Sequence, residues 1–247
     1  MSVNDGVVLL PSSGHLAVEC PCPLCASADI VHFSQDRRRA YWHCQRCDLV
    51  FAERKSLLDE AAELAIYQFH QNDPMDIHYR QFLMKLSTPL LARLSAHYPA
   101  GLAHLQALDF GSGPGPTLYL LMAEAGLRMA NYDPYFANDP SLLTHTFDLI
   151  CATEAIEHFY QPADEWQLWL TLLRANGYLG LMTKLRPEPA VFANWHYKND
   201  PTHVSFFSRQ TFEFLAHRDG LSVEFIGNDV ILLQKYCRND NDTMASI

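Results

Sequence analysis

Two pairs of cysteines near the N-terminus have the spacing of a metal site. Cys22 and Cys25 form one C-x-x-C unit, and Cys44 and Cys47 form a second after eighteen intervening residues. Each unit is a turn that directs two thiolates at one point, and two such turns supply the four soft ligands of a tetrahedral zinc ion. Cys20 lies close enough in the sequence to replace Cys22. Because four thiolates leave no position for water, the spacing predicts a structural zinc ribbon.

A glycine-rich turn occupies the middle of the chain. Asp109 ends an apolar run, and Gly111, Gly113 and Gly115 follow on alternate positions before Pro116 opens a helical pattern. Glycines let a backbone turn approach a nucleoside and adopt positive φ, and proline is tolerated in a first helical turn. The pattern predicts strand, tight turn and helix. Taken alone it fits an ordinary strand–helix connection as well as a nucleotide site.

Acidic residues follow the next two predicted strands. Asp133 lies twenty positions after Gly113 and ends a second short strand, where an acid in a doubly wound sheet accepts hydrogen bonds from ribose hydroxyls. Residues 147–152 form an apolar run interrupted only by Asp148, which is typical of a strand buried on both faces. The loop after that run carries Glu154, Glu157 and His158. This loop is expected to face the ligands at the carboxyl edge of the sheet.

Together these features resemble the class I S-adenosylmethionine-dependent methyltransferases, especially those that act on small molecules. Four segments within about residues 101–236 carry the resemblance in the family's order: Asp109–Gly115, Asn131–Asp133, Phe147–Phe159 and Asp200–Ser208. It implies an α/β fold with a Rossmann-like, doubly wound, mostly parallel sheet and a closing antiparallel strand. The zinc ribbon and a helical linker precede that sheet. Only thirteen residues separate Asp133 from Phe147, which leaves little room for the family's second helix and third strand. The adenine-contacting residue is therefore unassigned, with residues 141–145 its expected neighbourhood.

The resemblance implies S-adenosylmethionine as cofactor. The residues that it places at the cofactor are Asp109, Phe110, Gly111, Ser112, Gly113, Gly115, Asp133, Pro134, Thr153 and Glu154. Methyl transfer needs alignment more than an enzyme nucleophile, but a hydroxyl or acidic carbon acceptor is helped by a base near neutral pKa. The candidate bases, in order, are His203, His196 and His158, with Tyr197 a weaker one. For each histidine, a hydrogen-bonded imidazole without catalytic function is an equally good interpretation.

Other polar segments admit a structural interpretation beside a functional one. Residues 187–207 are rich in polar and aromatic side chains and are longer than a simple connection requires, so we interpret them as a wall of the acceptor pocket. Glu157 also fits a charge placed at a helix N-terminus. Arg37–Arg39 is interpreted as a solvated loop or strand end. Four further residues are candidates to line the pocket, although packing in a linker is favoured for them: Tyr67, His70, His78 and Tyr79.

Composition narrows the functional classes. The chain has 247 residues, 49% hydrophobic and 12% aromatic, and a net charge of −10. The apolar runs are too short for a membrane span, and the negative charge makes a nucleic-acid partner improbable, because nucleic-acid binding depends on neutralised phosphates. The first residues lack the pattern of a secretion signal, and the seven cysteines suit a reducing compartment. We expect a cytoplasmic protein whose partner is a small-molecule acceptor.

The domain organisation follows from these segments. The predicted units are a flexible leader at 1–19, the zinc ribbon at 20–55, a helical linker or cap at 56–100, the methyltransferase domain at 101–237 and a flexible tail at 238–247. Pro74 divides the linker into two helices. A helix over 164–174, with Trp166 in the core, is predicted to end at Asn176-Gly177 before a strand at 178–183. Ser208 is expected to cap a helix ending at Gly220, ahead of an antiparallel pair at 222–226 and 230–235.

Three functional hypotheses remain open from the sequence. In the first, the chain transfers a methyl group to a small-molecule or carrier-linked acceptor. In the second, the enzyme acts on RNA or protein and the ribbon is the reader, with salt-sensitive binding through Arg37–Arg39. In the third, the chain is a zinc-bearing interaction module with a vestigial donor pocket. The complete glycine turn and Asp133 speak against the third, and the short segment after Asp133 speaks weakly for it.

Overall fold

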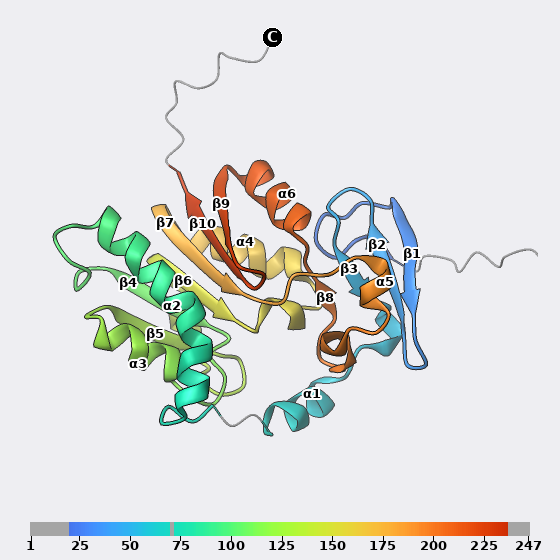
Figure 1. Cartoon of the computed structure of the whole chain (residues 1–247), viewed down its shortest axis with the longest axis horizontal. Coiled ribbons are helices and arrows are strands. Elements are labelled where there is room, and N and C mark those ends of the chain that lie inside the picture. The colour runs from blue at the N-terminus through green and yellow to red at the C-terminus, as the bar shows by residue number, and fades with distance from the viewer. Residues whose placement is uncertain (1–19, 70–71, 237–247) are drawn as a thin grey trace, which may run out of the picture.

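The computed structural model describes residues 20–69 and 72–236. The predicted leader and tail, and His70, lie outside these described residues. Within them the chain forms two sheets, a large one of six strands and a small one of four (Figure 1). Among the described residues, none of the helices is long and apolar enough to cross a bilayer.

The large sheet confirms the predicted α/β fold. Its strand order is β5-β4-β6-β7-β10-β9, with β5, β4, β6 and β7 parallel and β10 antiparallel to both of its neighbours. The strands are β4 (Gln106–Phe110), β5 (Arg128–Tyr132), β6 (Phe147–Thr153), β7 (Leu173–Met182), β9 (Leu221–Ile226) and β10 (Val230–Lys235). The order reverses between β4 and β6, so the carboxyl ends of these strands open the crevice where an α/β sheet binds its ligands.

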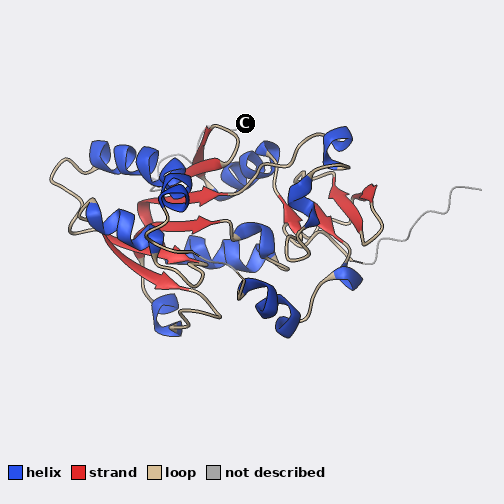
Figure 2. Ribbon diagram, turned by 60° about the horizontal axis from the view of Figure 1, so that its bottom comes forward, coloured by secondary structure: helices blue, strands red, loops and turns tan. Residues whose placement is uncertain are grey.

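Helices cover both faces of this sheet, as Figure 2 shows. The helices are α1 (Glu60–Tyr67), α2 (Ile77–His97), α3 (Thr117–Glu124), α4 (Pro162–Leu172), α5 (Pro189–Phe192) and α6 (Arg209–Asp219). Leucines of α2 and α3 form one apolar cluster with strand residues on one face of the sheet. Trp166 and Trp169 of α4 and Phe212 of α6 belong to a second apolar cluster, with strand residues on the other face. Strands that bury both faces need apolar side chains on both, which explains the nearly continuous apolar run of β6.

The ends of two helices test the local predictions. Ser208 accepts a hydrogen bond from the Thr211 amide at 3.1 Å, and Gly220 ends α6 at φ 72°, so both predicted caps of α6 are confirmed. The predicted end of α4 is wrong, because the helix stops at Leu172 and β7 begins at Leu173. The Asn176-Gly177 pair instead lies within β7, where Asn176 has φ 63° and the pairing with β6 shifts register. A β-bulge thus takes the place of the predicted turn.

The short connection between β5 and β6 contains no further strand or α-helix in the described residues, as its length predicted. Between β5 and β6 the described chain forms only a 3-10 helix, η2 (Pro140–Thr144), and the sheet ends at β5. The third strand and second helix of the resembling family are therefore missing from this part of the chain. The predicted division of the linker at Pro74 is confirmed by the separate helices α1 and α2.

The small sheet contains a strand that the sequence did not reveal. Its order is β1-β2-β3-β8, all antiparallel, formed by β1 (Ile30–Gln35), β2 (Ala40–Cys44), β3 (Val50–Ala52) and β8 (Ser205–Phe206). The first two strands lie between the two cysteine turns, at Ile30–Gln35 and Ala40–Cys44. The last pairs Val50 with Phe206 and comes from the excursion after β7. In Figure 1 the orange segments α5 and β8 accordingly lie against the blue ribbon strands.

An aromatic cluster fastens the excursion to the ribbon. Tyr41 and Val50 of the ribbon pack with Phe192, Tyr197 and Phe206 of the excursion, and all five side chains are buried. The ring centroids of Tyr41 and Phe192 are 5.1 Å apart in an edge-to-face arrangement. The segment predicted to wall the acceptor pocket is thus also part of the ribbon's own core.

Candidate active site and cysteine cluster

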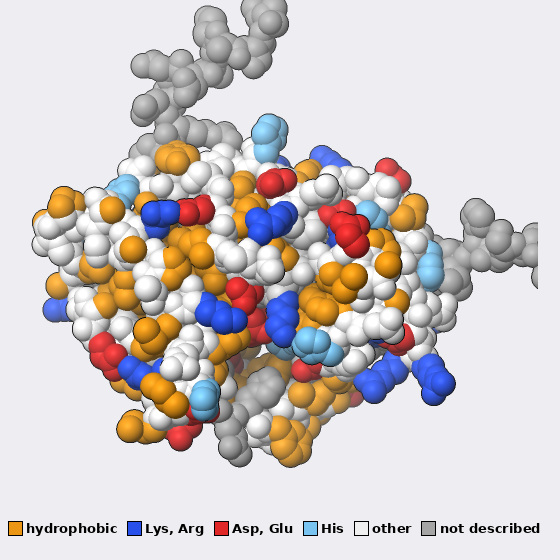
Figure 3. Space-filling model, in the orientation of Figure 1, with side chains coloured by type: hydrophobic (Ala, Val, Ile, Leu, Met, Phe, Trp, Pro, Cys, Tyr) orange, Lys and Arg blue, Asp and Glu red, His pale blue; other side chains and the backbone are white. Residues whose placement is uncertain are grey.

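A cavity of about 760 Å³ opens beyond the carboxyl ends of β4, β5 and β6. Phe110, Tyr132 and Thr153, at those three strand ends, line it. The space-filling view of Figure 3 shows a hollow at this lower edge of the molecule, near α1. Its volume falls within the usual range for small-molecule and cofactor sites. On the face in Figure 3, basic and acidic side chains are interspersed and do not gather in one patch.

The glycine turn forms the first wall of the cavity. Gly111 and Gly113 have φ of 77° and 64°, a region that other residues rarely adopt. A Cβ on Gly113 would lie 2.8 Å from the side-chain Nδ2 atom of Asn72. A Cβ on Gly115 would lie 2.0 Å from the backbone carbonyl oxygen of Asn72. Gly115 is not among the described residues that line the cavity. Its small size instead admits the segment that carries Asn72.

Asp133 holds the glycine turn against the end of β5. One carboxylate oxygen accepts a hydrogen bond from the Gly113 amide at 2.9 Å, and the other accepts from the amides of Tyr135 and Phe136 at 2.9 and 3.1 Å. Asp133 lines the cavity, as the ribose hypothesis requires, although only 7% of it is exposed. Each carboxylate oxygen can accept more than one hydrogen bond, so these contacts position the carboxylate and leave it capacity for a ligand.

Asp109 lies behind the turn and not on its surface. It is 2% exposed, it is not among the described residues that line the cavity, and its Oδ1 atom is buried without a hydrogen-bond partner among the described residues. Burial, reinforced by the nearby charge of Asp133, raises the pKa of Asp109 to about 7. Its carboxyl group therefore supports the turn from below.

The other predicted cofactor residues meet at the same wall. Phe110, Gly111, Ser112, Gly113, Asp133, Pro134, Thr153 and Glu154 all line the cavity. They come from three strand ends that are consecutive in the sheet, which explains why separate motifs converge. The neighbourhood expected for adenine, residues 141–145, does not contribute to the described lining.

Glu165 of α4 is a lining residue that the sequence analysis missed. Its Oε2 atom is buried without a hydrogen-bond partner among the described residues, and burial raises its pKa to about 7. It borders the cavity together with Leu168, Phe110 and Phe159. In the sequence it is one of two acids in the first turn of a helix, where acids are ordinary because they complement the helix dipole. No local signal distinguishes it.

Two of the three predicted histidines also lie at the cavity. His158 and His203 line the cavity, and their ring centroids are 4.7 Å apart. His203 Nδ1 lies 2.7 Å from the Tyr197 carbonyl oxygen, and His158 Nδ1 lies 3.2 Å from that of Thr202. A carbonyl only accepts, so each Nδ1 carries a proton. Burial lowers the pKa of His203, although Asp200 opposes the shift, so the ring is neutral near pH 7.

The remaining candidate bases lie outside the cavity lining. His196 is exposed, and its Nε2 atom is 3.2 Å from Lys184 Nζ. Tyr197 is buried behind the wall, where burial and the neighbouring Glu157 and Glu154 raise its pKa well above the usual range. Neither residue is among the described residues that line the cavity. The structure therefore brings His158 and His203 together and separates His196 from them.

A buried glutamate, Glu157, and a half-buried one, Glu154, lie near the histidines. The Tyr197 hydroxyl donates a short hydrogen bond to Glu157 Oε1 and lies 3.1 Å from Glu154 Oε2. Burial raises the pKa of Glu154 to about 6. Burial and the nearby charge of Glu154 raise the pKa of Glu157 to about 8. Glu157 is 1% exposed, and its Oε2 atom has no hydrogen-bond partner among the described residues. The charge at a helix N-terminus that we considered for Glu157 therefore does not account for its burial.

The linker contributes two of the four pocket candidates proposed for it. Tyr67 and Tyr79 line the cavity, whereas His78 is exposed and outside the lining. Glu63 joins them, because its carboxylate accepts hydrogen bonds from Tyr67 at 2.7 Å and from Tyr135 at 3.0 Å. For Tyr67 and Tyr79, the pocket interpretation is thus favoured over simple linker packing.

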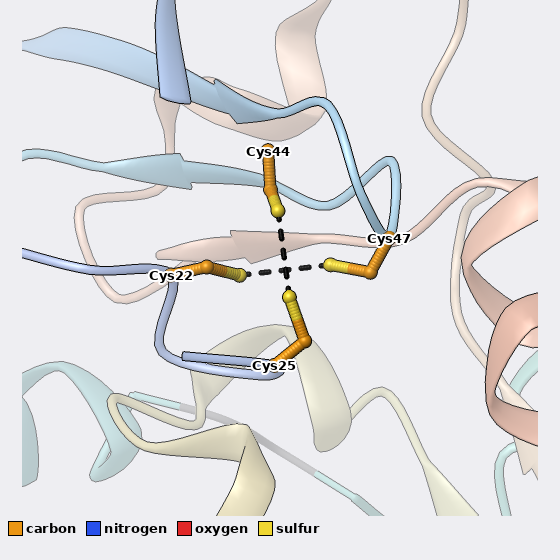
Figure 4. Close-up of side chains that lie close together, drawn as sticks. All are labelled: Cys22, Cys25, Cys44 and Cys47. Carbon is orange, nitrogen blue, oxygen red and sulfur yellow. Dashed lines mark hydrogen bonds between the residues drawn. The ribbon is translucent and has the colours of Figure 1, made fainter. Parts of the chain in front are cut away.

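The four cysteine sulfurs converge on one point, as Figure 4 shows. Cys22 Sγ lies 3.6 Å from Cys47 Sγ, and Cys25 Sγ lies 3.5 Å from Cys44 Sγ. These distances are too long for disulfides and are close to the edge of about 3.8 Å that zinc–sulfur bonds of about 2.3 Å give a tetrahedron. The four ligand atoms lie within 4.8 Å of one another, and Cys20 is not part of the group. The arrangement fits a closed tetrahedral metal site.

Arg39 connects the ribbon to the segment that carries His203. Its Nη2 atom donates to the carbonyl oxygens of Lys198 at 2.5 Å and Asp200 at 2.9 Å, and its Nη1 atom donates to that of Pro201 at 3.2 Å. Arg39 is 5% exposed, so the interpretation of the whole Arg37–Arg39 run as solvated is wrong for this residue. Its guanidinium supplies donors to three backbone carbonyls, two of which also accept longer hydrogen bonds, Lys198 from the Tyr41 hydroxyl at 3.4 Å and Asp200 from the His203 amide at 3.2 Å.

Asp48, beside the second cysteine pair, makes the other connection. Its carboxylate accepts hydrogen bonds from His43 at 2.6 Å, from Arg186 at 2.7 Å and from the Ser208 hydroxyl. Burial alone would raise the pKa of Asp48, but these donors outweigh it and lower the pKa to about 2. The cysteine turn is thus joined to the end of β7 and to the cap of α6.

Comparison with known proteins places the chain in a family. The sequence profile of a family described as a methyltransferase domain matches residues 75–224. No curated protein matches the chain.

The chain also resembles solved structures. Magnesium protoporphyrin IX methyltransferase from Synechocystis PCC 6803, solved with bound S-adenosylhomocysteine, is 14% identical; the match covers 71% of this chain and 93% of that one, with a TM-score of 0.47. An O-methyltransferase family protein from Burkholderia thailandensis is 15% identical over 71% of this chain and 68% of that one, with a TM-score of 0.45. A SAM-dependent methyltransferase from Archaeoglobus fulgidus is 17% identical over 64% of this chain and 99% of that one, with a TM-score of 0.44. Since the profile spans more than half of the sequence, the chain belongs to the family of methyltransferase domains.

Proposed function

We propose that the chain transfers a methyl group from S-adenosylmethionine to a small-molecule or carrier-linked acceptor inside the described cavity. The observation that carries the proposal is that two sets of residues line one cavity. The glycine turn and Asp133, here called the donor wall, and His158 and His203, the acceptor wall, line the same space. A donor held at the first wall and an acceptor held at the second would share that space, as an in-line displacement requires.

The proposed donor site consists of the cofactor residues that line the cavity. Asp133 would accept hydrogen bonds from the ribose hydroxyls, and the glycine turn would admit the nucleoside against its backbone. Asp109 and Gly115 would act indirectly, by supporting the turn and the Asn72 segment. Glu165, a buried carboxyl without a described partner, is suited to meet a polar edge of the base.

His203 is the leading candidate to activate the acceptor. Its Nδ1 proton is donated to a carbonyl, so Nε2 carries the lone pair of a neutral imidazole. In the proposed step the acceptor oxygen attacks the methyl carbon as the carbon–sulfur bond breaks. The acceptor's proton moves to Nε2 and S-adenosylhomocysteine leaves. His158 is the alternative base on the same wall, and His196 and Tyr197 are less favoured because they lie outside it.

The four cysteines are proposed to bind a structural zinc ion. A closed set of four thiolates contributes folding energy and no catalytic position, so the ion would hold the ribbon that carries Arg39 and Asp48. We retain the division into ribbon, linker and methyltransferase domain as a proposal, with residues 187–207 bridging the first and last. Cysteines used as metal ligands also support a reducing, cytoplasmic location.

A ribbon that reads RNA is less well supported. That hypothesis relied on Arg37–Arg39, and the Arg39 guanidinium is occupied by backbone carbonyls of residues 198–201. The vestigial-pocket hypothesis is disfavoured by membership of the methyltransferase family and by a cavity whose lining retains the glycine turn and Asp133.

Calorimetric titration of the zinc-loaded protein with S-adenosylhomocysteine tests the proposed donor site. We expect micromolar binding by the wild type and affinity lower by about a hundredfold in Asp133→Ala, because a buried charged acceptor is removed. Asp139→Ala, an exposed acid that caps η2, is the matched control and should bind like the wild type. Wild-type protein that binds no S-adenosylhomocysteine would refute the donor site. Confirmed binding would justify a screen of metabolites as acceptors.

A further inference from the structure

One cluster at the acceptor wall has the composition of a metal site. Glu157, His158 and His203 each offer a ligand atom, and these atoms all lie within 4.8 Å of one another. Two of the residues belong to the 3-10 helix η3 (Ile156–His158), and the third comes from the loop before β8. Two imidazole nitrogens and a carboxylate form a set that first-row transition metals accept well.

The hydrogen bonds of the two histidines suit this role. Each Nδ1 proton is directed at a backbone carbonyl, that of Thr202 for His158 and that of Tyr197 for His203. This fixes the tautomer in which Nε2 carries the lone pair. Histidines that bind metals usually have their other ring nitrogen held in this way, because the second bond orients the ring.

Among the described residues, neither glutamate has a lysine or arginine in direct contact, although Lys184 and Lys85 act on Glu154 from a distance. Within residues 20–69 and 72–236, neither Glu154 nor Glu157 forms an ion pair with a lysine or arginine, and Glu157 Oε2 accepts no hydrogen bond. The hydroxyl of Tyr197 has one hydrogen to share between the two carboxyl groups. Buried carboxylates are normally paired or bound to a metal, so a cation at this point would offset the desolvation cost.

The backbone at Glu154 supports the same conclusion. Glu154 has φ 48°, in the left-handed region that a glutamate rarely occupies. Strained residues persist where the surrounding structure requires the side chain to point in one direction, and they cluster at functional sites. Here the strain turns a second carboxylate toward Tyr197 and the cavity.

We propose that Glu157, His158 and His203 bind a divalent transition-metal cation at the acceptor wall, with Glu154 as a further carboxylate beside it. His158, His203 and Glu154 line the cavity, so coordination positions on the cavity side would remain open to an oxygen of the acceptor. The proposal rests on the proposed function only in placing the acceptor at this wall.

The cation changes the role of His203. With Nε2 bound to the cation, this ring would be a ligand and not the base. A cation held by these residues would act as a Lewis acid that lowers the pKa of an acceptor hydroxyl, whose proton would pass to solvent. The acceptor oxygen would form the new carbon–oxygen bond as the methyl carbon–sulfur bond breaks, with S-adenosylhomocysteine as the leaving group.

Manganese binding to the full-length, zinc-loaded protein tests the site directly. Mn²⁺ suits nitrogen and oxygen ligands and does not compete well for four thiolates, and its electron paramagnetic resonance signal reports the free ion. We expect one bound Mn²⁺ per chain. Affinity should fall at least tenfold in Glu157→Gln, which keeps the acceptor oxygen for Tyr197, and also in His203→Gln. Glu165→Gln removes another buried acid of the same cavity and should leave Mn²⁺ affinity unchanged within twofold.

Two outcomes would overturn the proposal. One is no Mn²⁺ binding by wild-type protein at millimolar concentration, and the other is unchanged affinity in both variants. Titration of the same samples with S-adenosylhomocysteine separates this result from the proposed function. S-adenosylhomocysteine binding without Mn²⁺ binding would refute the cation site alone, whereas Mn²⁺ binding without S-adenosylhomocysteine binding would support the cation site and refute the donor site.

Discussion

The donor wall of the cavity comes from a short, continuous part of the chain, whereas the acceptor wall is assembled from segments far apart in the sequence. The strand–turn–helix of β4 and α3, followed by β5 and Asp133, occupies residues 106–133. His158 follows β6, and His203 lies in an excursion that is paired with the N-terminal ribbon through β3 and β8. The donor wall therefore depends mainly on local backbone conformation, and the acceptor wall depends on a distant module that carries the cysteine cluster.

This difference makes the two walls separable by experiment. A change in the ribbon should disturb the segment around His203 and leave the donor site intact. A change in the glycine turn should do the reverse.

Removal of the zinc ligands should have the largest effect, and only on the acceptor wall. In Cys44→Ser/Cys47→Ser we expect the ribbon to unfold, because structural zinc sites of this kind supply on the order of 10 kcal/mol of folding energy. The amides of residues 203–206 should lose their protection in hydrogen exchange, since Val50 and Phe51 pair with Phe206 and Ser205. Affinity for S-adenosylhomocysteine should stay within threefold of wild type. Persistent protection of these amides would contradict the dependence of this wall on the ribbon.

A methyl group added to the glycine turn should produce the opposite result. In Gly113→Ala, the new Cβ would lie 2.8 Å from the side-chain Nδ2 atom of Asn72, and the alanine would have to adopt the φ of 64° that Gly113 has. We expect affinity for S-adenosylhomocysteine to fall by about tenfold or more, because strain of about 1.4 kcal/mol corresponds to a factor of ten. Calorimetry gives the affinity, and hydrogen exchange of residues 203–206 is the control, which should match wild type. Unchanged affinity would mean that the turn is not the cofactor wall.

Loss of the Arg39 side chain should loosen the acceptor wall without unfolding the ribbon. Arg39→Met keeps the length of the side chain but leaves the carbonyl oxygens of Lys198, Asp200 and Pro201 without their donor. We expect the free energy of unfolding to fall by about 2–4 kcal/mol and exchange to accelerate around residues 198–204. Exposed Arg38→Met, which removes one hydrogen bond to the Asn199 carbonyl, is the matched control and should have little effect. Equal losses of unfolding free energy in both variants would show that the burial of Arg39 does not account for its effect on stability.

Glu165, a half-buried acid of α4 that lines the cavity, should give the smallest effect, which depends on pH. Burial raises the pKa of Glu165 to about 7 from an ordinary value of 4.5. Between these two pH values the folded state therefore keeps a proton that the unfolded chain has already released. Wild-type stability should therefore fall by about 1–3 kcal/mol as the pH rises from 4.5 through 7. Glu165→Gln should remove this part of the decline in urea unfolding between pH 5 and 8. Glu213→Gln, an exposed acid on α6, should keep it. Identical pH profiles for wild type and Glu165→Gln would contradict the raised pKa.

The parts of the molecule that were predictable have local causes. The glycine turn, the caps of α6 and the cysteine turns each depend on residue types within a few positions of one another, so the printed sequence displays them. The same holds for β6, whose apolar run reflects burial on both faces. Membership of the methyltransferase family confirms the enzyme class that these motifs indicated.

The parts that were not predictable depend on contacts between distant residues. Nothing near Ser205 or Phe206 marks them as a strand, because their partners in β3, Phe51 and Val50, are 154 and 156 positions earlier. Arg39 is part of a basic run that looks solvated, and only the approach of residues 198–201 buries it. Glu165 resembles any acid in a first helical turn until α4 packs beside the cavity.

The fold class, the glycine turn and the cysteine cluster were therefore predictable from the sequence alone, because local conformation and ligand spacing suffice for these. Which histidines line the cavity depends on tertiary packing, which places His158 and His203 in the lining and His196 outside it. The pairing of the ribbon with the segment that carries His203 depends on tertiary packing too. The physical reason is that a side chain's direction in a long excursion is set by what the excursion packs against, and here the packing partners are Tyr41, Val50 and Arg39 of the ribbon.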